Sequence, residues 1–228
     1  MSYKPNTLLF LDIETTGLHE RARLLEIGAL LVRASDLEIV APFQTIVECR
    51  DGPSTDVWET EAFKMHAANG LLGTIAGKSP SLATSAADAV HQFEAWLKKL
   101  GQPAKTCSIA GSSVHMDVAF LRRQVPDFDW SRFSHRLLDI STLRAFSEIA
   151  GLKLFPEKKE YEGHRALADC HQDLEQLRVA TAKARSLWSV TITDRASGDV
   201  IVGDKPDVEK GEDAMFGQGK EDKDAGKE

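Results

Sequence analysis

The stretch LLFLDIETTGL, residues 8–18, constrains the fold more than any other part of the sequence. Its aliphatic and aromatic residues predict a buried β-strand, and alternation along that strand puts Asp12 and Glu14 on the same face. The same face carries Leu8 and Phe10, which is not the pattern of a half-exposed strand. Two adjacent carboxylates there are costly, because desolvation and mutual repulsion oppose their ionisation. A divalent cation removes this cost, so the strand predicts a metal site completed by acids elsewhere.

The composition indicates a globular domain in a reducing compartment. With 228 residues, of which 42% are apolar and 28% charged, the chain is long enough for one domain with a full core. No apolar run approaches the ~20 residues that a membrane helix needs, and the first strand begins too early to leave room for a signal peptide. Three widely spaced cysteines predict a cytoplasmic protein without disulfides or a zinc motif.

The C-terminal segment differs in composition from the rest of the chain. Residues 203–228 hold nine acids and five lysines and are nearly free of apolar residues, which predicts a disordered acidic tail after a domain spanning residues 1–202. The tail contributes −4 of the net charge of −7. The domain therefore lacks the basic excess of proteins that bind long duplexes, so a nucleic-acid substrate is expected to be short or gripped locally.

Strand and helix patterns occur together along the chain and predict an α/β domain. The β-rich runs 24–34 and 37–48 predict a hairpin or meander. Further patterns predict short strands at 106–111 and 135–141 and helices at 79–101, 114–125, 142–151 and 166–188.

Two later segments supply further acids and a histidine. Asp117 follows a Gly-Ser-Ser turn at the start of a helix, where an acid can alternatively serve as a helix cap. His164 and Asp169 are five residues apart, so on one continuous helix they would be rotated roughly 140° from each other. They converge only if His164 lies in the loop before the helix. The alternative is a solvated helix start with Arg165 and Asp169 as an i,i+4 pair.

Taken together, these motifs resemble those of the DEDDh 3′→5′ exonucleases. The elements are DIETTG at 12–17, Asp117 in GSSVHMD, and the H-x-x-x-x-D pair His164 and Asp169. Within that group the chain is most similar to the oligoribonucleases, through HRLLDIST at 135–142, MHAANGL at 65–71 and HRALAD at 164–169. The resemblance covers roughly residues 7–185. It implies an RNase H-like fold, a central mixed β-sheet flanked by helices, and hydrolysis of short oligoribonucleotides to 5′-mononucleotides.

The resemblance also implies how the site works. The ligands of two divalent ions, Mg²⁺ or Mn²⁺, would be Asp12, Glu14, Asp117 and Asp169, since hard cations prefer oxygen ligands. Two such ions activate the attacking water and stabilise the leaving oxygen. His164 would be the general base, because the pKa of imidazole, ~6.5, lies near the working pH.

Substrate contacts follow from the same resemblance. Leu18 matches a leucine that wedges between two bases, and His66 matches a histidine near the substrate. A cap over the 5′ phosphate of a dinucleotide, with its arginine from the partner subunit of a homodimer, corresponds to Ser113, Arg136, Ser141 and Thr142. From the residues alone, Leu18 is equally compatible with the core and His66 with the surface. Ser141 and Thr142 are equally compatible with a helix N-cap.

The chain departs from the oligoribonuclease pattern at several positions. Glu61 stands where family members often carry a tryptophan, which leaves open whether Trp58 or Phe63 stacks on a base. His135 replaces a tyrosine and Ser112 an asparagine. The E-T-T-G motif is typical of the proofreading and RNase T branches, so an exonuclease for longer single-stranded DNA or RNA is the alternative. An inactive exonuclease fold that only binds is a further alternative, as is an acidic interaction protein.

Overall fold

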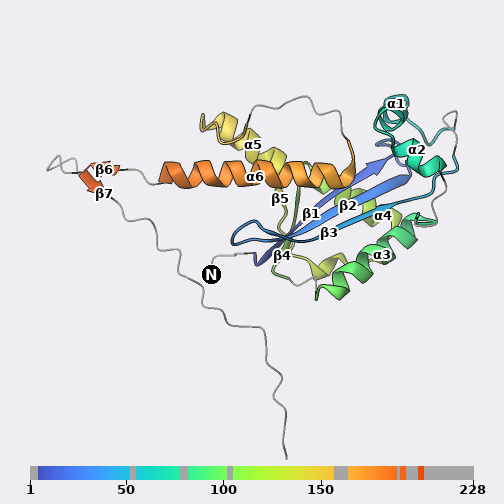
Figure 1. Cartoon of the computed structure of the whole chain (residues 1–228), viewed down its shortest axis with the longest axis horizontal. Helices are drawn as coiled ribbons and strands as arrows, with labels where there is room; N and C mark the ends of the chain where they lie inside the picture. The colour runs from blue at the N-terminus through green and yellow to red at the C-terminus, as the bar shows by residue number, and fades with distance from the viewer. Residues whose placement is uncertain are drawn as a thin grey trace, which may run out of the picture. The chain divides into compact units, whose positions relative to one another are not determined.

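A mixed five-stranded sheet, in the order β3-β2-β1-β4-β5, organises the first structural unit, residues 1–183 (Figure 1). The computed structural model describes residues 5–51, 55–77, 82–101, 105–156, 164–188, 191–193 and 200–202. The antiparallel strands are the edge strand β3 (Ile39–Ile46), β2 (Leu24–Arg33) and the central strand β1 (Thr7–Thr15). Strand β4 (Cys107–Gly111) runs parallel to β1, and β5 (Leu138–Asp139) runs parallel to β4. The predicted mixed sheet and the β2–β3 hairpin are confirmed.

Among the described residues, helices occur at the four predicted segments, two of them starting at least two residues from the predicted position, and three further helical segments between residues 60 and 132 were not predicted. They are α1 (Thr60–Ala68), α2 (Leu71–Ala76), α3 (Ala86–Lys99), α4 (His115–Gln124), the short 3₁₀ helix η1 (Trp130–Arg132), α5 (Ile140–Ile149) and α6 (Ala166–Trp188). Helix α3 begins at Ala86 and not at residue 79, because the hydroxyl of Ser85 accepts a hydrogen bond from the N–H of Asp88 and caps the first turn. Residues 79–81 of that prediction lie outside the described residues.

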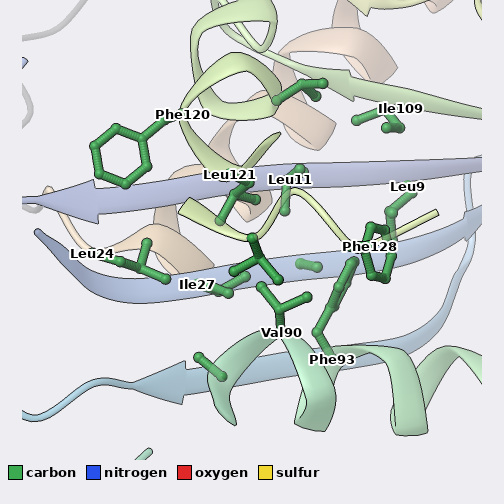
Figure 2. Close-up of a cluster of buried hydrophobic side chains, with 14 of the residues drawn as sticks. Leu9, Leu11, Leu24, Ile27, Val90, Phe93, Ile109, Phe120, Leu121 and Phe128 are labelled. Carbon is green, nitrogen blue, oxygen red and sulfur yellow. The ribbon is translucent and has the colours of Figure 1, made fainter. Parts of the chain in front are cut away.

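The two faces of β1 build two separate cores, as strand alternation predicts. Leu9 and Leu11 pack with α3 and α4 in the cluster drawn in Figure 2, where Phe93 of α3 lies beneath the sheet. Leu8 and Phe10 pack on the opposite face with Cys170 and other buried residues of α6. Asp12 and Glu14 have the same parity as Leu8 and Phe10, so their side chains emerge on the α6 face.

Gly28 of β2 allows α6 to lie directly against the sheet. A Cβ atom at this position would be 2.2 Å from the backbone nitrogen of Leu167 and 2.3 Å from the carbonyl carbon of Ala166. The thiol of Cys170 donates to the carbonyl of Gly28 at 3.4 Å. Only glycine accommodates this approach, which brings the start of α6 beside the residue paired with Asp12 in the β1–β2 register.

The second unit, residues 184–228, contains a small antiparallel pair of strands. Strands β6 (Thr191–Thr193) and β7 (Val200–Val202) pair through Ile192 and Ile201. The predicted disordered tail, residues 203–228, lies outside the described residues, and the domain boundary at residue 202 stays a prediction. Among the described residues, none of the helices has the length and apolar character needed to cross a membrane.

Candidate active site

Three carboxylates from two elements converge at the end of β1. Oxygen atoms of Asp12, Glu14 and Asp169 all lie within 4.8 Å of one another. Asp12 and Glu14 come from β1, opposite Gly28 and Glu26 of β2, and Asp169 comes from the first turns of α6. The close approach of α6 at Gly28 therefore supplies the third acid that the strand pair lacked.

Asp117 joins this cluster from α4 through the backbone of β1. One of its carboxylate oxygens accepts a hydrogen bond from the N–H of Ile13 at 3.2 Å. Val114, not Asp117, occupies the N-cap position of α4, and no side chain caps it. The alternative reading of Asp117 as a helix cap is therefore wrong, and the residue is tied to the strand between Asp12 and Glu14.

Burial and mutual repulsion dominate the electrostatics of the four acids. Burial, followed by the charges of Asp117 and Glu14, raises the pKa of Asp12 well above its usual range. Burial and then the charge of Asp169 raise the pKa of Glu14 to about 9. Burial likewise raises the pKa of Asp117 to about 7 and that of Asp169 to about 6. Such a set of oxygen ligands fits a hard divalent cation, whose charge would restore the ionised forms.

His164 lies in the loop immediately before α6, as the prediction required. It is exposed and has a positive φ of 34°, which is uncommon for a residue other than glycine. The side-chain amide of Asn69, the C-cap residue of α1, donates to the carbonyl oxygen of His164 at 2.5 Å. Burial raises the pKa of Asp169, and the electrostatic interaction with His164 lowers it by a smaller amount. The histidine therefore lies beside the acids and is held there by a separate element.

A buried glutamate that the sequence analysis did not single out supports the same loop. Glu26 is fully buried, and its carboxylate accepts two hydrogen bonds from the Arg165 guanidinium, both at 2.9 Å. Further bonds come from the amide of Gln44 and, at 3.3 Å, from the N–H of Ala166. The alternative pairing of Arg165 with Asp169 is therefore wrong. The sequence could have indicated this ion pair, because Glu26 lies inside the apolar run 24–32 and a buried charge needs a partner.

Asp173 is a second buried acid that sequence reasoning missed. It lies one turn after Asp169 on α6, and its carboxylate accepts from the N–H and the hydroxyl of Ser112 at 2.5 and 2.7 Å. Burial raises its pKa against these two hydrogen bonds. The sequence could have indicated this residue, because Asp173 lies four positions after Asp169 and residues at that spacing share a face of a helix. Asp173 thus anchors the turn between β4 and α4 that leads to Asp117.

Part of the predicted phosphate cap is brought together within one chain. The hydroxyl of Ser113 donates to the hydroxyl of Ser141 at 3.3 Å. Asp139 is the N-cap of α5 and accepts from the N–H of Thr142 at 2.9 Å, so the N-cap reading of Ser141 and Thr142 is wrong. Arg136 is exposed in the segment before β5.

Leu18 and His66 lie in opposite environments. Leu18 is 74% exposed, and its N–H donates to the carboxylate of Glu59 at 3.0 Å, so the core reading is wrong. His66 is fully buried, with Nε2 2.9 Å from the carbonyl of Thr15 and 3.8 Å from Glu14, so the surface reading is wrong as well. Burial lowers the pKa of His66, which favours the neutral ring with Nε2–H donating to Thr15.

Trp58 and Phe63 form one aromatic pair beside this region. Their ring centroids are 5.3 Å apart in an edge-on arrangement, and the indole N–H of Trp58 donates to the carbonyl of Asp51. Trp58 also lies edge-on to His66, 6.4 Å between centroids. Both aromatic side chains are partly exposed, so both remain candidates for stacking on a base.

Comparison with known proteins agrees with this geometry. The RNase_T family model, described as an exonuclease, matches residues 9–177. An oligoribonuclease of Azoarcus sp. is 31% identical over 180 residues, which are 78% of this chain and 94% of that protein. An oligoribonuclease of Thiobacillus denitrificans is 31% identical over 179 residues, with 78% and 94% covered.

Solved structures show the same fold at low sequence identity. E. coli exonuclease I in complex with a dT13 oligonucleotide superposes with a TM-score of 0.58 at 16% identity, covering 82% of this chain and 44% of that one. The exonuclease I of Methylocaldum szegediense gives a TM-score of 0.56 at 14% identity, covering 80% and 42%. The RNase H-like exonuclease architecture is therefore confirmed.

Proposed function

The chain belongs to the oligoribonuclease family of 3′→5′ exonucleases, and from this premise we propose that it hydrolyses short single-stranded oligonucleotides to 5′-mononucleotides. One observation carries the proposal: the cluster of Asp12, Glu14 and Asp169, with His164 in the segment that leads directly into the helix of Asp169. The name of the relatives, oligoribonuclease, favours short RNA as the substrate. The dT13 oligonucleotide bound to E. coli exonuclease I favours a single-stranded substrate. The free cysteines are consistent with a reducing compartment such as the cytoplasm.

Two divalent cations, Mg²⁺ or Mn²⁺, complete the proposed site. Asp12, Glu14, Asp169 and Asp117 would hold them through carboxylate oxygens, the donors that these cations prefer. When bound, the cations polarise the scissile phosphate and stabilise the attacking and leaving oxygens. The protein contributes acids from three elements, β1, α4 and α6, to one region of the fold.

His164 is the proposed general base. Its imidazole takes a proton from the attacking water while the water oxygen bonds to the phosphorus of the terminal nucleotide. The bond from that phosphorus to the 3′ oxygen of the preceding nucleotide breaks, and the 3′ oxygen gains a proton. The exposed position of His164 beside the acids suits this role, because the base must reach the water and then release the proton to solvent.

Leu18 and the hydroxyls of Ser113 and Ser141 are the proposed length gauge. The exposed leucine, three residues after the last residue of β1, can insert between two bases, and the paired hydroxyls can bind a terminal phosphate. Arg136 and Thr142 would complete the phosphate cap, and His66 would hold the strand end through Thr15. A site of this kind measures length and not base sequence.

We further propose a homodimer in which Arg136 acts in the partner's site. Phe146 and Ile149, one turn apart on α5, are 59% and 87% exposed, and Leu137 and Leu152 beside this helix are also exposed. Such an apolar face on a helix next to Arg136 suits a second copy of the chain. Replacing Ile149 by Asp is expected to give a monomer in sedimentation with little activity on dinucleotides.

Mixing two inactive variants tests the action in trans. Arg136→Ala lacks the phosphate contact and Asp12→Asn lacks a metal ligand, so each homodimer is expected to be slow. In a mixed dimer, the Asp12→Asn chain would supply Arg136 to an intact cluster in its partner and restore part of the activity. An absence of recovery after confirmed subunit exchange would contradict the arrangement in trans.

The substrate class is tested with a ladder of oligonucleotides from dinucleotides to 20-mers, as RNA and as DNA, with Mg²⁺ or Mn²⁺. The proposal expects the highest kcat/KM on the shortest RNA and release of 5′-mononucleotides. The E-T-T-G motif favours the alternative, a longer single-stranded DNA substrate, and a clear preference for DNA 20-mers would establish it. A binding-only role would show no hydrolysis with either metal.

A further inference from the structure

The loop that carries His164 is held from two sides by residues outside the acid cluster. On one side, the fully buried Glu26 grips the guanidinium of Arg165 through both oxygens at 2.9 Å and also accepts from the N–H of Ala166. On the other side, the amide of Asn69 donates to the carbonyl of His164 itself. The contacts therefore reach three consecutive residues, from His164 to Ala166.

The backbone of His164 needs such support. A φ of 34° lies in a sparsely populated region, and residues held there cost about 1–3 kcal/mol unless their surroundings over-determine them. The hydrogen bonds at His164, Arg165 and Ala166 hold the backbone in this conformation. Without them, the loop is expected to relax and carry the imidazole away from the acids.

Stability alone does not explain the buried ion pair. A buried pair of this kind is often no more stabilising than apolar residues of the same volume, because desolvation offsets the attraction. Its geometry is specific, however: the planar Arg165 fork matches both carboxylate oxygens of Glu26. Glu26 lies on β2 opposite Glu14 in the β1–β2 register, so the pair ties the His164 loop to the strand that is paired with the acid-bearing strand β1.

We propose that Glu26 and Asn69 are positioning residues, which act through His164 by fixing its loop against the acid cluster. This inference rests on the proposed role of His164 as the general base. Neither residue would touch substrate or cation. Their contribution would be to hold the imidazole within the narrow range of positions from which it can take the proton of the attacking water.

Two conservative variants test the two sides separately. Glu26→Gln keeps the shape of the side chain but weakens the charge-assisted fork to Arg165. Asn69→Asp keeps the oxygen that accepts from the N–H of Leu71 at 3.0 Å but removes the donor to His164. Arg178→Met is the matched control, since Arg178 is an arginine within α6 that donates to the carbonyl of Leu37 and not to Glu26.

Each positioning variant is expected to lower kcat on a dinucleotide by about 10- to 100-fold, the scale of a misplacement of about 1 Å. The KM should change little, and the rise of kcat with pH that His164 produces should flatten. Arg178→Met should retain kcat and its pH profile. A merely structural role for Glu26 and Asn69 would lower the melting temperature but leave the kcat of folded enzyme and its pH profile intact.

The double variant Glu26→Gln/His164→Ala decides whether Glu26 acts through the histidine. If it does, the double variant should be no slower than His164→Ala alone, because the effects of residues that act as a unit do not add. Fully additive losses would overturn the inference. If His164→Ala is slow while Glu26→Gln and Asn69→Asp retain kcat, the inference fails and the proposed base stands. An undiminished kcat of His164→Ala would contradict both the proposed role of His164 as general base and the positioning role of Glu26 and Asn69.

Discussion

The carboxylate of Asp117 accepts a hydrogen bond from the N–H of Ile13, a residue 104 positions earlier in the chain, at 3.2 Å. Ile13 separates Asp12 from Glu14 on β1, so this bond joins the fourth acid to the strand at the centre of the cluster. It lowers the pKa of Asp117, but burial outweighs it. The site is thus assembled with carboxyl groups that are reluctant to ionise until cations are present.

Replacing Asp12 by Asn is expected to abolish hydrolysis without unfolding the protein. A lost metal ligand removes several kcal/mol of transition-state stabilisation, or roughly a 10³-fold or greater loss of kcat. The melting temperature in EDTA should stay the same or rise, because burial and repulsion oppose the charge that is removed. Asp36→Asn, in the exposed β2–β3 turn, is the control and should keep full activity. Near-normal turnover of Asp12→Asn would rule out the assigned role.

The metal-free protein should lose stability as the pH rises. The pKa of Glu14 is about 9, above its ordinary value near 4.5, so the folded state holds a proton that the unfolded state releases. The stability that this proton confers is present below pH 4.5 and is lost progressively up to about pH 9. Asp117 and Asp169 act in the same direction up to about pH 7 and 6.

Divalent cations should reverse this trend. Mg²⁺ binds the ionised carboxylates, so the rise in melting temperature on adding Mg²⁺ should be larger at pH 8 than at pH 5. Thermal unfolding with EDTA and with Mg²⁺ across this range checks the sign. A metal-free protein that becomes steadily more stable between pH 5 and 9 would contradict the raised pKa values.

Gly28→Ala should damage both stability and activity. The added Cβ would lie 2.2 Å from the backbone of Leu167, and backbone atoms cannot move aside as a flexible side chain can. Overpacking of this kind costs about 1–3 kcal/mol and would displace the start of α6 with Asp169. Gly73→Ala in α2, where no atom lies within 4 Å of the added methyl group, is the control. Urea unfolding and kcat measure the two effects.

Leu18→Ala should weaken substrate binding and leave stability unchanged. The side chain is 74% exposed in the free protein, so its truncation creates no cavity. If it inserts between two bases, losing about 1–2 kcal/mol of apolar contact should raise the KM for a dinucleotide by about 5- to 30-fold. Val40→Ala, an exposed apolar residue on the edge strand β3, is the control. An unchanged KM would exclude the wedge.

Local pattern was sufficient for much of the framework. The period of two along β1 put Asp12 and Glu14 on one face, and the period of 3.6 along α6 required His164 to lie in the loop before the helix. The structure has both features. The strand segments, the hairpin and the helices α3, α4, α5 and α6 were predictable for the same reason, because these patterns depend on neighbours close in sequence, whereas α1 and α2 were not predicted.

Contacts between distant segments decided the rest. Periodicity along the chain established which residues share a face, since backbone geometry fixes the periods of strands and helices. It did not determine that Leu18 is exposed and His66 buried, that Arg165 pairs with Glu26, or that Asp139 caps α5. Each of these depends on how β2, α1 and α6 close on one another, and burial and hydrogen-bond partners exist only after that closure.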